Sequence, residues 1–115
     1  MASGKLSNQL VSSDFVNEQS VEIDNVTINA NSNLDIDTET TTYSAYRAVK
    51  DGYTPLGIGG ISLQNASSSG SNSSNCIPTG WRVFNNGHIF LRIKNSGASN
   101  AKIVIRLRIV WVRNR

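Results

Sequence analysis

The chain contains one histidine, His88, and any search for catalytic chemistry begins with this residue. Nucleophilic catalysis places a base such as histidine beside a serine or cysteine, and an acid orients the base. Serines are abundant, but none lies in the Gly-x-Ser-x-Gly pattern of a nucleophile elbow. His88 follows the dipeptide Asn86-Gly87, which is typical of a tight turn, so we interpret it as the opening residue of a strand. We therefore predict no catalytic residues and no enzymatic activity.

The single cysteine, Cys76, excludes an intrachain disulfide and a cysteine-rich metal site. It follows a serine-rich segment, and we interpret it as a small buried residue rather than a reactive thiol. Asp35, Asp37 and Glu39 would share one face of a strand and could bind Ca²⁺ if a loop added carbonyl oxygens. The alternative, a face that is solvated or paired with arginine, is the interpretation we prefer. The sequence thus predicts no metal site and no cofactor.

Gly57, Gly59 and Gly60 resemble a phosphate-binding loop in composition only. No Gly-Lys-Ser/Thr follows them, and no helix is expected there to bind phosphate. Glycines inside a strand more often mark a bulge or the close approach of a neighbouring backbone, and this is our interpretation.

Acidic and basic residues are distributed unevenly. Residues 1–42 contain seven of the eight acidic residues and one of the eleven basic ones. This asymmetry indicates either nucleic-acid binding or an acidic strand that lies beside basic strands, and we prefer the second explanation.

One strand face near the C-terminus mixes arginines with valines. Together with Arg92, its two arginines could form a basic stripe that faces a phosphate backbone. Because β-branched residues interrupt it, we predict instead a subunit interface, with the arginines paired to acids of the N-terminal half. The predicted interface residues are Val104, Arg106, Arg108 and Val110.

The element that must position this face is a long strand over residues 101–113. Alternate residues are apolar for more than ten positions, whereas a helix would scatter the same side chains around its axis. The residues expected on its buried face are Ile103, Ile105, Leu107, Ile109 and Trp111.

Turn signals divide the rest of the chain into further strands. We expect seven or eight strands in total, an all-β antiparallel β-sandwich of the jelly-roll kind. Residues 1–19 lack a period and are expected to be an N-terminal arm or linker, with the head domain over 20–115. The other expected strands cover 21–28 with a bulge or tight turn at Asp24-Asn25, 34–42, 43–49 and 53–63 joined by Asp51-Gly52, and 81–84 and 88–94 joined by Asn86-Gly87.

The domain is small, so it buries a modest core and association of copies would cover more apolar surface. No run approaches the roughly 18 apolar residues of a membrane span, and the first residues lack the apolar segment of a secretory signal. We expect a soluble protein made in a cytoplasm, without membrane insertion.

The segments AYRAVKDGYTPLGIGGISLQN and GWRVFNNGHIFLRIKNSGASNAKIVIRLRIVWV, separated by a polar loop, give residues 46–113 a recognisable order. This order resembles the C-terminal head, or knob, domains of bacteriophage tail-fibre and receptor-binding proteins. The shared features are a Gly-Tyr-x-Pro-Leu-Gly-like strand, a hairpin, and an Asn-rich turn before a final apolar strand. They are strand and turn residues, with no catalytic signature.

The resemblance implies a virion protein that forms a homotrimer and binds a host-surface receptor, often a saccharide. It also implies that the N-terminal arm connects the domain to other virion proteins. Fibre proteins are typically much longer than this chain, so an excised head or a separate small virion component both fit. Aromatic stacking and the polar loop direct our candidate ligand contacts, although each tyrosine could equally be a core or interface residue. The candidates are Tyr43, Tyr46, Tyr53, Ser67, Ser69, Asn72 and Asn75.

Two other functions compete with receptor binding. A capsid decoration or head-fibre protein would use the same fold to bind other virion subunits. A nucleic-acid-binding β domain would use Arg92, Arg106 and Arg108, and its binding would weaken steeply with salt. An enzyme ranks last, because its activity would have to depend on His88.

Overall fold

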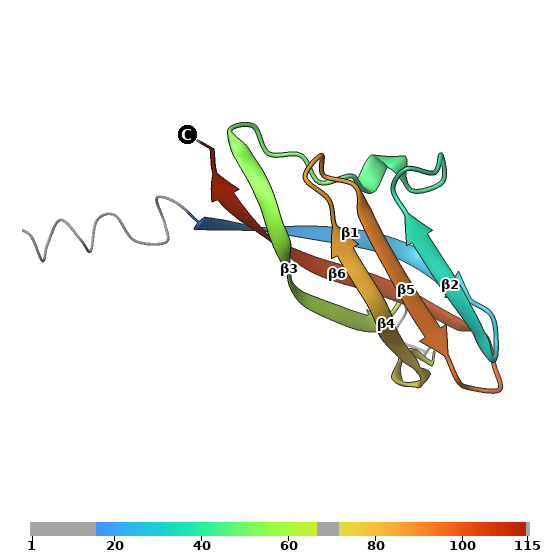
Figure 1. Ribbon diagram of the computed structural model, residues 1–115. Coiled ribbons are helices and arrows are strands. Elements are labelled where there is room, and N and C mark those ends of the chain that lie inside the picture. The colour runs from blue at the N-terminus through green and yellow to red at the C-terminus, as the bar shows by residue number, and fades with distance from the viewer. Residues whose placement is uncertain (1–15, 67–71, 115) are drawn as a thin grey trace, which may run out of the picture.

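Two antiparallel three-stranded sheets face each other in the computed structural model, which describes residues 16–66 and 72–114 (Figure 1). The prediction of an all-β antiparallel sandwich is confirmed, but the prediction of seven or eight strands is wrong, since the described residues form six. The first sheet has the order β1 (Val16–Ile28), β6 (Ala101–Arg113), β3 (Tyr53–Asn65), and the second has the order β2 (Ser32–Asp37), β5 (Ile89–Asn95), β4 (Cys76–Val83).

The strand pairs are nested along the chain. β1 pairs with β6, and β2, which follows β1, pairs with β5, which precedes β6. β3 and β4 complete the two sheets on the other side of β6 and β5. A jelly roll nests its strand pairs in the same way but has eight strands.

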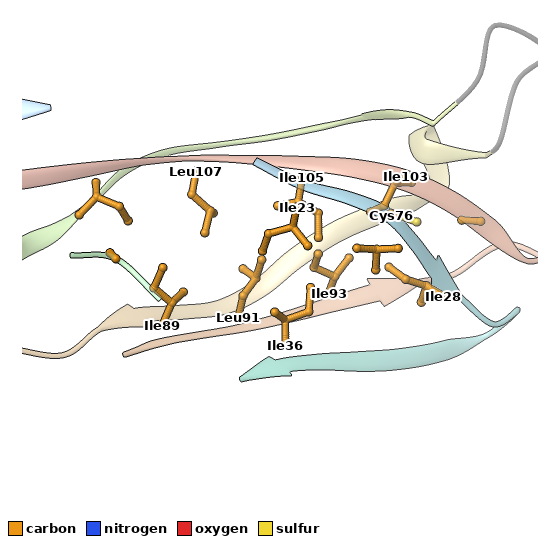
Figure 2. Packing of buried hydrophobic residues seen from close by; sticks show 14 of the residues in the cluster. Ile23, Ile28, Ile36, Cys76, Ile89, Leu91, Ile93, Ile103, Ile105 and Leu107 are labelled. Carbon is orange, nitrogen blue, oxygen red and sulfur yellow. The ribbon is translucent and has the colours of Figure 1, made fainter. Parts of the chain in front are cut away.

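The core lies between the sheets and is lined by alternate residues of the two central strands. The five residues expected on the buried face of β6 are all at most 1% exposed, as predicted. They face β5, where the pattern alternates in the same way, and Figure 2 shows these side chains meeting between the layers. The labelled members are Ile23, Ile28, Ile36, Cys76, Ile89, Leu91, Ile93, Ile103, Ile105 and Leu107.

The phase change at Asp24-Asn25 is a β-bulge inside one strand, not a turn between two strands. Ile23 pairs with Ile105 and Val26 pairs with Ile103, so Asp24 and Asn25 together lie opposite the single residue Val104. Asn25 takes a left-handed backbone (φ 54°), which asparagine tolerates better than most residues. β1 begins at Val16, four residues before the expected start of the head domain, and residues 1–15 of the expected arm lie outside the described residues.

The strand expected over 43–49 is absent, and this prediction is wrong. Ser44–Tyr46 form the 3₁₀ turn η1, in which the Tyr46 N–H donates to the Tyr43 carbonyl. The Ala48 N–H then donates to the Gly87 carbonyl (3.0 Å), which ties this segment to the β4–β5 turn instead of to a sheet. Alternation of tyrosine and alanine over so few residues did not distinguish a strand from a turn that packs on the end of the core.

Asparagines close the other end of the sandwich. Asn95 is fully buried, and its Nδ2 donates to the carbonyls of Ile28 (3.0 Å) and Ser99 (2.9 Å). Its Oδ1 accepts from the Gly97 N–H (2.9 Å), so one side chain joins the end of β1 to the β5–β6 turn. Buried polar groups are stable only when hydrogen-bonded in this way.

No helix within residues 16–66 and 72–114 is long and apolar enough to cross a membrane.

Candidate functional site

The outer face of the first sheet carries the residues predicted as a subunit interface. Because side chains alternate along β6, its second face points away from the core. Val104 and Val110 are half-buried there, and Arg106 and Arg108 are exposed. These four residues and their neighbours in register on β1 and β3 form the outer face.

The two arginines of the outer face pair with acids of β1, as the charge distribution predicted. Arg106 Nε donates to Glu22 Oε2 (2.8 Å), and its Nη1 donates to Gln64 Oε1 on β3 (2.9 Å). This hydrogen bond with Arg106 lowers the pKa of Glu22 below its usual range. Arg108 reaches Glu18 only at 3.9 Å. The charges of the outer face are therefore largely compensated within the chain.

Glycines on β3 make room for this face. A Cβ on Gly59 would lie 2.9 Å from a methyl group of Val110, and one on Gly60 would lie 2.8 Å from Nη2 of Arg108. The interpretation of these glycines as sites of bulging and close approach is confirmed, since the β3–β6 register shifts between Pro55 and Gly57 and again between Ile58 and Gly60. A shallow hollow of about 270 Å³ lies beside Gly60; its lining is Ser20, Gly60, Ile61, Ser62, Arg106, Leu107 and Arg108.

Arg92 lies on the other sheet. It forms a two-pronged pair with Asp35, through Nε (2.6 Å) and Nη2 (2.9 Å), and this pair lowers the pKa of Asp35. Since β5 and β6 belong to opposite layers, the outward-facing arginines of the two strands do not form one stripe. Arg92 therefore does not share one surface with Arg106 and Arg108.

His88 lies at the end of the sandwich where η1 and the β4–β5 turn meet. Its Nε2 contacts Asp37 Oδ1 (2.5 Å), its Nδ1 lies 3.5 Å from Glu39 Oε1, and its ring stacks on Phe84 with centroids 4.6 Å apart. The Glu39 N–H, which donates to Asp37, contributes most to lowering the pKa of Asp37, and His88 adds to this. The histidine thus joins β2 to the β4–β5 turn.

The cluster of His88, Asp37 and Glu39 has no cysteine nucleophile nearby. Cys76 pairs in register with Asn95, whereas His88 precedes Ile89 at the opposite end of β5, so the thiol and the imidazole are far apart. Cys76 is buried, as predicted, and burial raises the pKa of its thiol. Asp35 is arginine-paired, as preferred over a calcium site. Within the described residues no three acidic, histidine or cysteine side chains are arranged to hold a metal ion.

The three candidate tyrosines lie at this same end of the molecule. Tyr43 and Tyr46 are half-buried against the core, with ring centroids 6.5 Å apart at 44°. Burial raises the pKa of the Tyr43 hydroxyl. Tyr53 is also half-buried, and Lys50 Nζ lies 4.8 Å from the centre of its ring. Each tyrosine therefore packs on the core with one part and reaches solvent with another.

Of the polar candidates, Asn72 and Asn75 lie at the opposite end. Ser67 and Ser69 lie outside the described residues. Asn72 adopts a left-handed backbone at the start of η2 (Ser73–Asn75), and its Nδ2 donates to the Asn100 carbonyl (2.9 Å). The Asn75 carbonyl accepts from the Ser96 N–H (3.0 Å). The structure therefore does not bring the tyrosines and these asparagines into one site.

One feature of the tyrosine end was missed from sequence. A hollow of about 130 Å³ lies between the segment after η1 and the β4–β5 turn. Its floor includes Trp111, whose alternation in β6 indicates only a core residue. No local pattern could have identified this hollow, because its walls come from three separate parts of the chain. Its lining is Ala48, Val49, Lys50, Tyr53, Pro55, Asn85, Asn86, Gly87 and Trp111.

No family model, curated protein or solved structure matches this chain.

Proposed function

We propose that the chain is a non-enzymatic structural domain of a phage virion, which assembles into a homotrimeric knob through its outer face and binds a host-surface receptor through its loop ends. The assignment to a phage rests on the resemblance of residues 46–113 to tail-fibre heads. The trimeric state also comes from that resemblance, and the outer face is the surface that could form it.

The observation that carries the proposal is the composition of the outer face. Val104 and Val110 keep part of their apolar surface exposed beside arginines whose charges are matched within the chain. Most of the β3 residues that share this face have small side chains, so the surface is open and shallow. Interfaces are enriched in arginine, and flat surfaces of mixed polarity suit association between proteins. The β3 residues in register with β6 on this face are Thr54, Gly57, Gly60, Ser62 and Gln64.

Receptor contact is assigned to the end of the sandwich that carries the tyrosines. Tyrosine combines apolar contact area with a polar hydroxyl, and it loses little conformational entropy on binding. Three copies in one knob would present three such ends, so weak individual sites would combine into stable attachment.

Light scattering after size-exclusion chromatography of the full chain tests the assembly. We expect a mass three times the 12.5 kDa of one chain. Val110→Glu would bury an unpaired charge at the interface and should yield folded monomers. Ile77→Glu, at an exposed apolar position of β4, is the matched control and should leave the trimer intact. A wild-type monomer at micromolar concentration contradicts the proposed assembly.

The receptor role needs a second measurement. Binding of the oligomer to a glycan array should reveal saccharide recognition, and Tyr46→Ala should reduce it. Tight binding to isolated capsids, without binding to glycans or host cells, would instead indicate a capsid decoration protein.

A further inference from the structure

Trp111 contains a buried polar group without a partner. The side chain is 1% exposed, and its Nε1 is the one buried side-chain nitrogen or oxygen in residues 16–66 and 72–114 that lacks a hydrogen bond. An unpaired buried donor costs about 1–3 kcal/mol, and native structures rarely leave one. This donor therefore needs an explanation that the packing of the core does not supply.

The unpaired indole belongs to the residues that line the 130 Å³ hollow, here called the end pocket. Pro55, its neighbour in register on β3, and Tyr53 form apolar walls beside it. The remaining walls come from the irregular segment 48–50 and from the β4–β5 turn. The segment 48–50 belongs to no sheet and is tied to the β4–β5 turn by the Ala48 N–H. Because Trp111 Nε1 is buried, a ligand would have to displace side chains of the pocket wall to reach it.

Four oxygens of residues that line the end pocket already accept hydrogen bonds. The Asn86 carbonyl accepts from Arg47 Nε (3.1 Å), and Asn86 Oδ1 accepts from the His88 N–H (3.0 Å). The carbonyls of Gly87 and Lys50 accept from backbone N–H groups, at 3.0 and 3.2 Å. These four acceptors are thus directed toward the protein.

The donors of the end pocket, in contrast, are available. Besides the indole N–H, Lys50 carries an ammonium group that forms no ion pair with any described residue and lies over the ring of Tyr53. The side-chain N–H groups of Asn85 and Asn86 donate to no described acceptor. A ligand group that only accepts hydrogen bonds and carries negative charge would satisfy this set, and an ionised carboxylate has both properties.

We propose that the end pocket binds a small carboxylate, with the carboxylate held by Trp111 Nε1 and Lys50 and the rest of the ligand against Tyr53. A volume of about 130 Å³ is well below the roughly 300–1,000 Å³ of sites for drug-sized molecules, so the pocket admits one small unit. The carboxylate could belong to an acidic sugar or to a simple organic acid. As a receptor site, though not as a carboxylate site, the assignment rests on the proposed function.

Proton–nitrogen NMR of the full chain observes the key donor directly. The chain has two tryptophans, so two indole N–H signals are expected, and Trp81→Phe identifies that of Trp111. Glucuronate should move the Trp111 signal in a saturable way, acetate should move it more weakly, and glucose should leave it unchanged. An acetate effect equal to that of glucuronate would identify a simple organic acid as sufficient.

Lys50→Gln tests whether the positive charge of Lys50 contributes to binding of the carboxylate. We expect it to raise the dissociation constant of glucuronate about fivefold, the factor that corresponds to losing one partly exposed ion pair. Lys94→Gln, at an exposed position on the outer side of β5, is the matched control and should not change binding.

Two results would overturn the inference. One is a Trp111 signal that responds to neither carboxylate, because the indole would then be satisfied without a ligand. The other is an equal response to glucose and glucuronate, which would exclude recognition of the charge. If carboxylates bind but the chain is monomeric or does not bind host surfaces, the proposed function is wrong and the carboxylate site is supported. If trimers bind host surfaces but carboxylates do not move the Trp111 signal, the carboxylate site is wrong and the proposed function is supported.

Discussion

The central strand of each sheet carries an arginine opposite a glycine, and the two arginines use that space differently. Arg108 of β6 is in register with Gly60 of β3, and Arg92 of β5 is in register with Gly80 of β4. The guanidinium of Arg108 occupies the space where a Gly60 Cβ would be, at 2.8 Å, whereas nothing lies within 4 Å of the corresponding point at Gly80. Arg92 turns instead to the other edge strand and pairs with Asp35.

The register of the acidic edge strand explains this difference. Asp35 lies directly opposite Arg92, so a short aspartate reaches the guanidinium without a shift along the strand. The residue opposite Arg108 is Ser20, and the nearest acid, Glu18, is two positions away, where the charged groups come only within 3.9 Å. An arginine with an acid opposite turns toward it, and one without such an acid spreads over the glycine. Arg108 is therefore paired only loosely, with Glu18, whereas Arg92 is paired closely with Asp35.

Among the three glycines compared, Gly87 should lose the most stability when it is replaced by alanine. A Cβ at Gly87 would lie 1.8 Å from the Ala48 carbonyl oxygen, and its φ of +89° disfavours other residues. Gly87→Ala should lower the free energy of unfolding by roughly 2–4 kcal/mol, because here the backbone itself must move. Denaturant unfolding measures it; a loss no larger than that of Gly60→Ala would contradict the assigned contact.

Gly60→Ala should have a smaller effect, because the obstacle is the mobile end of a side chain. Displacement of Arg108 into a less favourable rotamer is expected to cost about 1 kcal/mol in denaturant unfolding. Ser20→Asp would place an acid directly opposite Arg108 and draw it away from β3. In that background Gly60→Ala should cost less, and equal costs in both backgrounds would show that register does not control the arginine.

Low pH should weaken the ion pairs whose two residues lie directly opposite each other, Asp35 with Arg92 and Glu22 with Arg106. The lowered folded-state pKa values of Asp35 and Glu22 mean that their contributions are present above the ordinary values of 3.8 and 4.5 and are lost as pH falls through the folded-state values. Asp24, whose pKa its hydrogen bond with Glu22 raises, opposes this trend. Thermal unfolding as a function of pH should show a drop in stability below about pH 4. The drop should be smaller in Asp35→Asn and unchanged in the control Asn33→Ser, which alters an exposed neutral residue of the same strand.

Gly80→Ala should have the smallest effect. Its Cβ would enter open space, so we expect a change within about 0.5 kcal/mol in either direction. A loss similar to that of Gly60→Ala would remove the distinction between the two glycines.

Much of the fold could be predicted, because its evidence is local. The five apolar residues on one face of β6 follow a period of two, and Asn86-Gly87 marks the β4–β5 turn. The strand over 43–49 was predicted wrongly, since the spacing of Tyr43 and Tyr46 fits a strand as well as a turn that packs on the core. The outer face was located from its own alternation, but the end pocket was not, since Lys50 and Trp111 are distant in sequence.

Sequence alone determined which face of β6 is buried, because adjacent side chains point to opposite sides and apolar residues must leave water. It also indicated that acids of the N-terminal half would meet arginines of the C-terminal half. Only the tertiary structure decided which acid meets which arginine, which glycine an arginine covers, and that the Trp111 N–H is left without a partner. Those outcomes depend on register between strands that are far apart in the chain, and a shift of one residue would change every one of them.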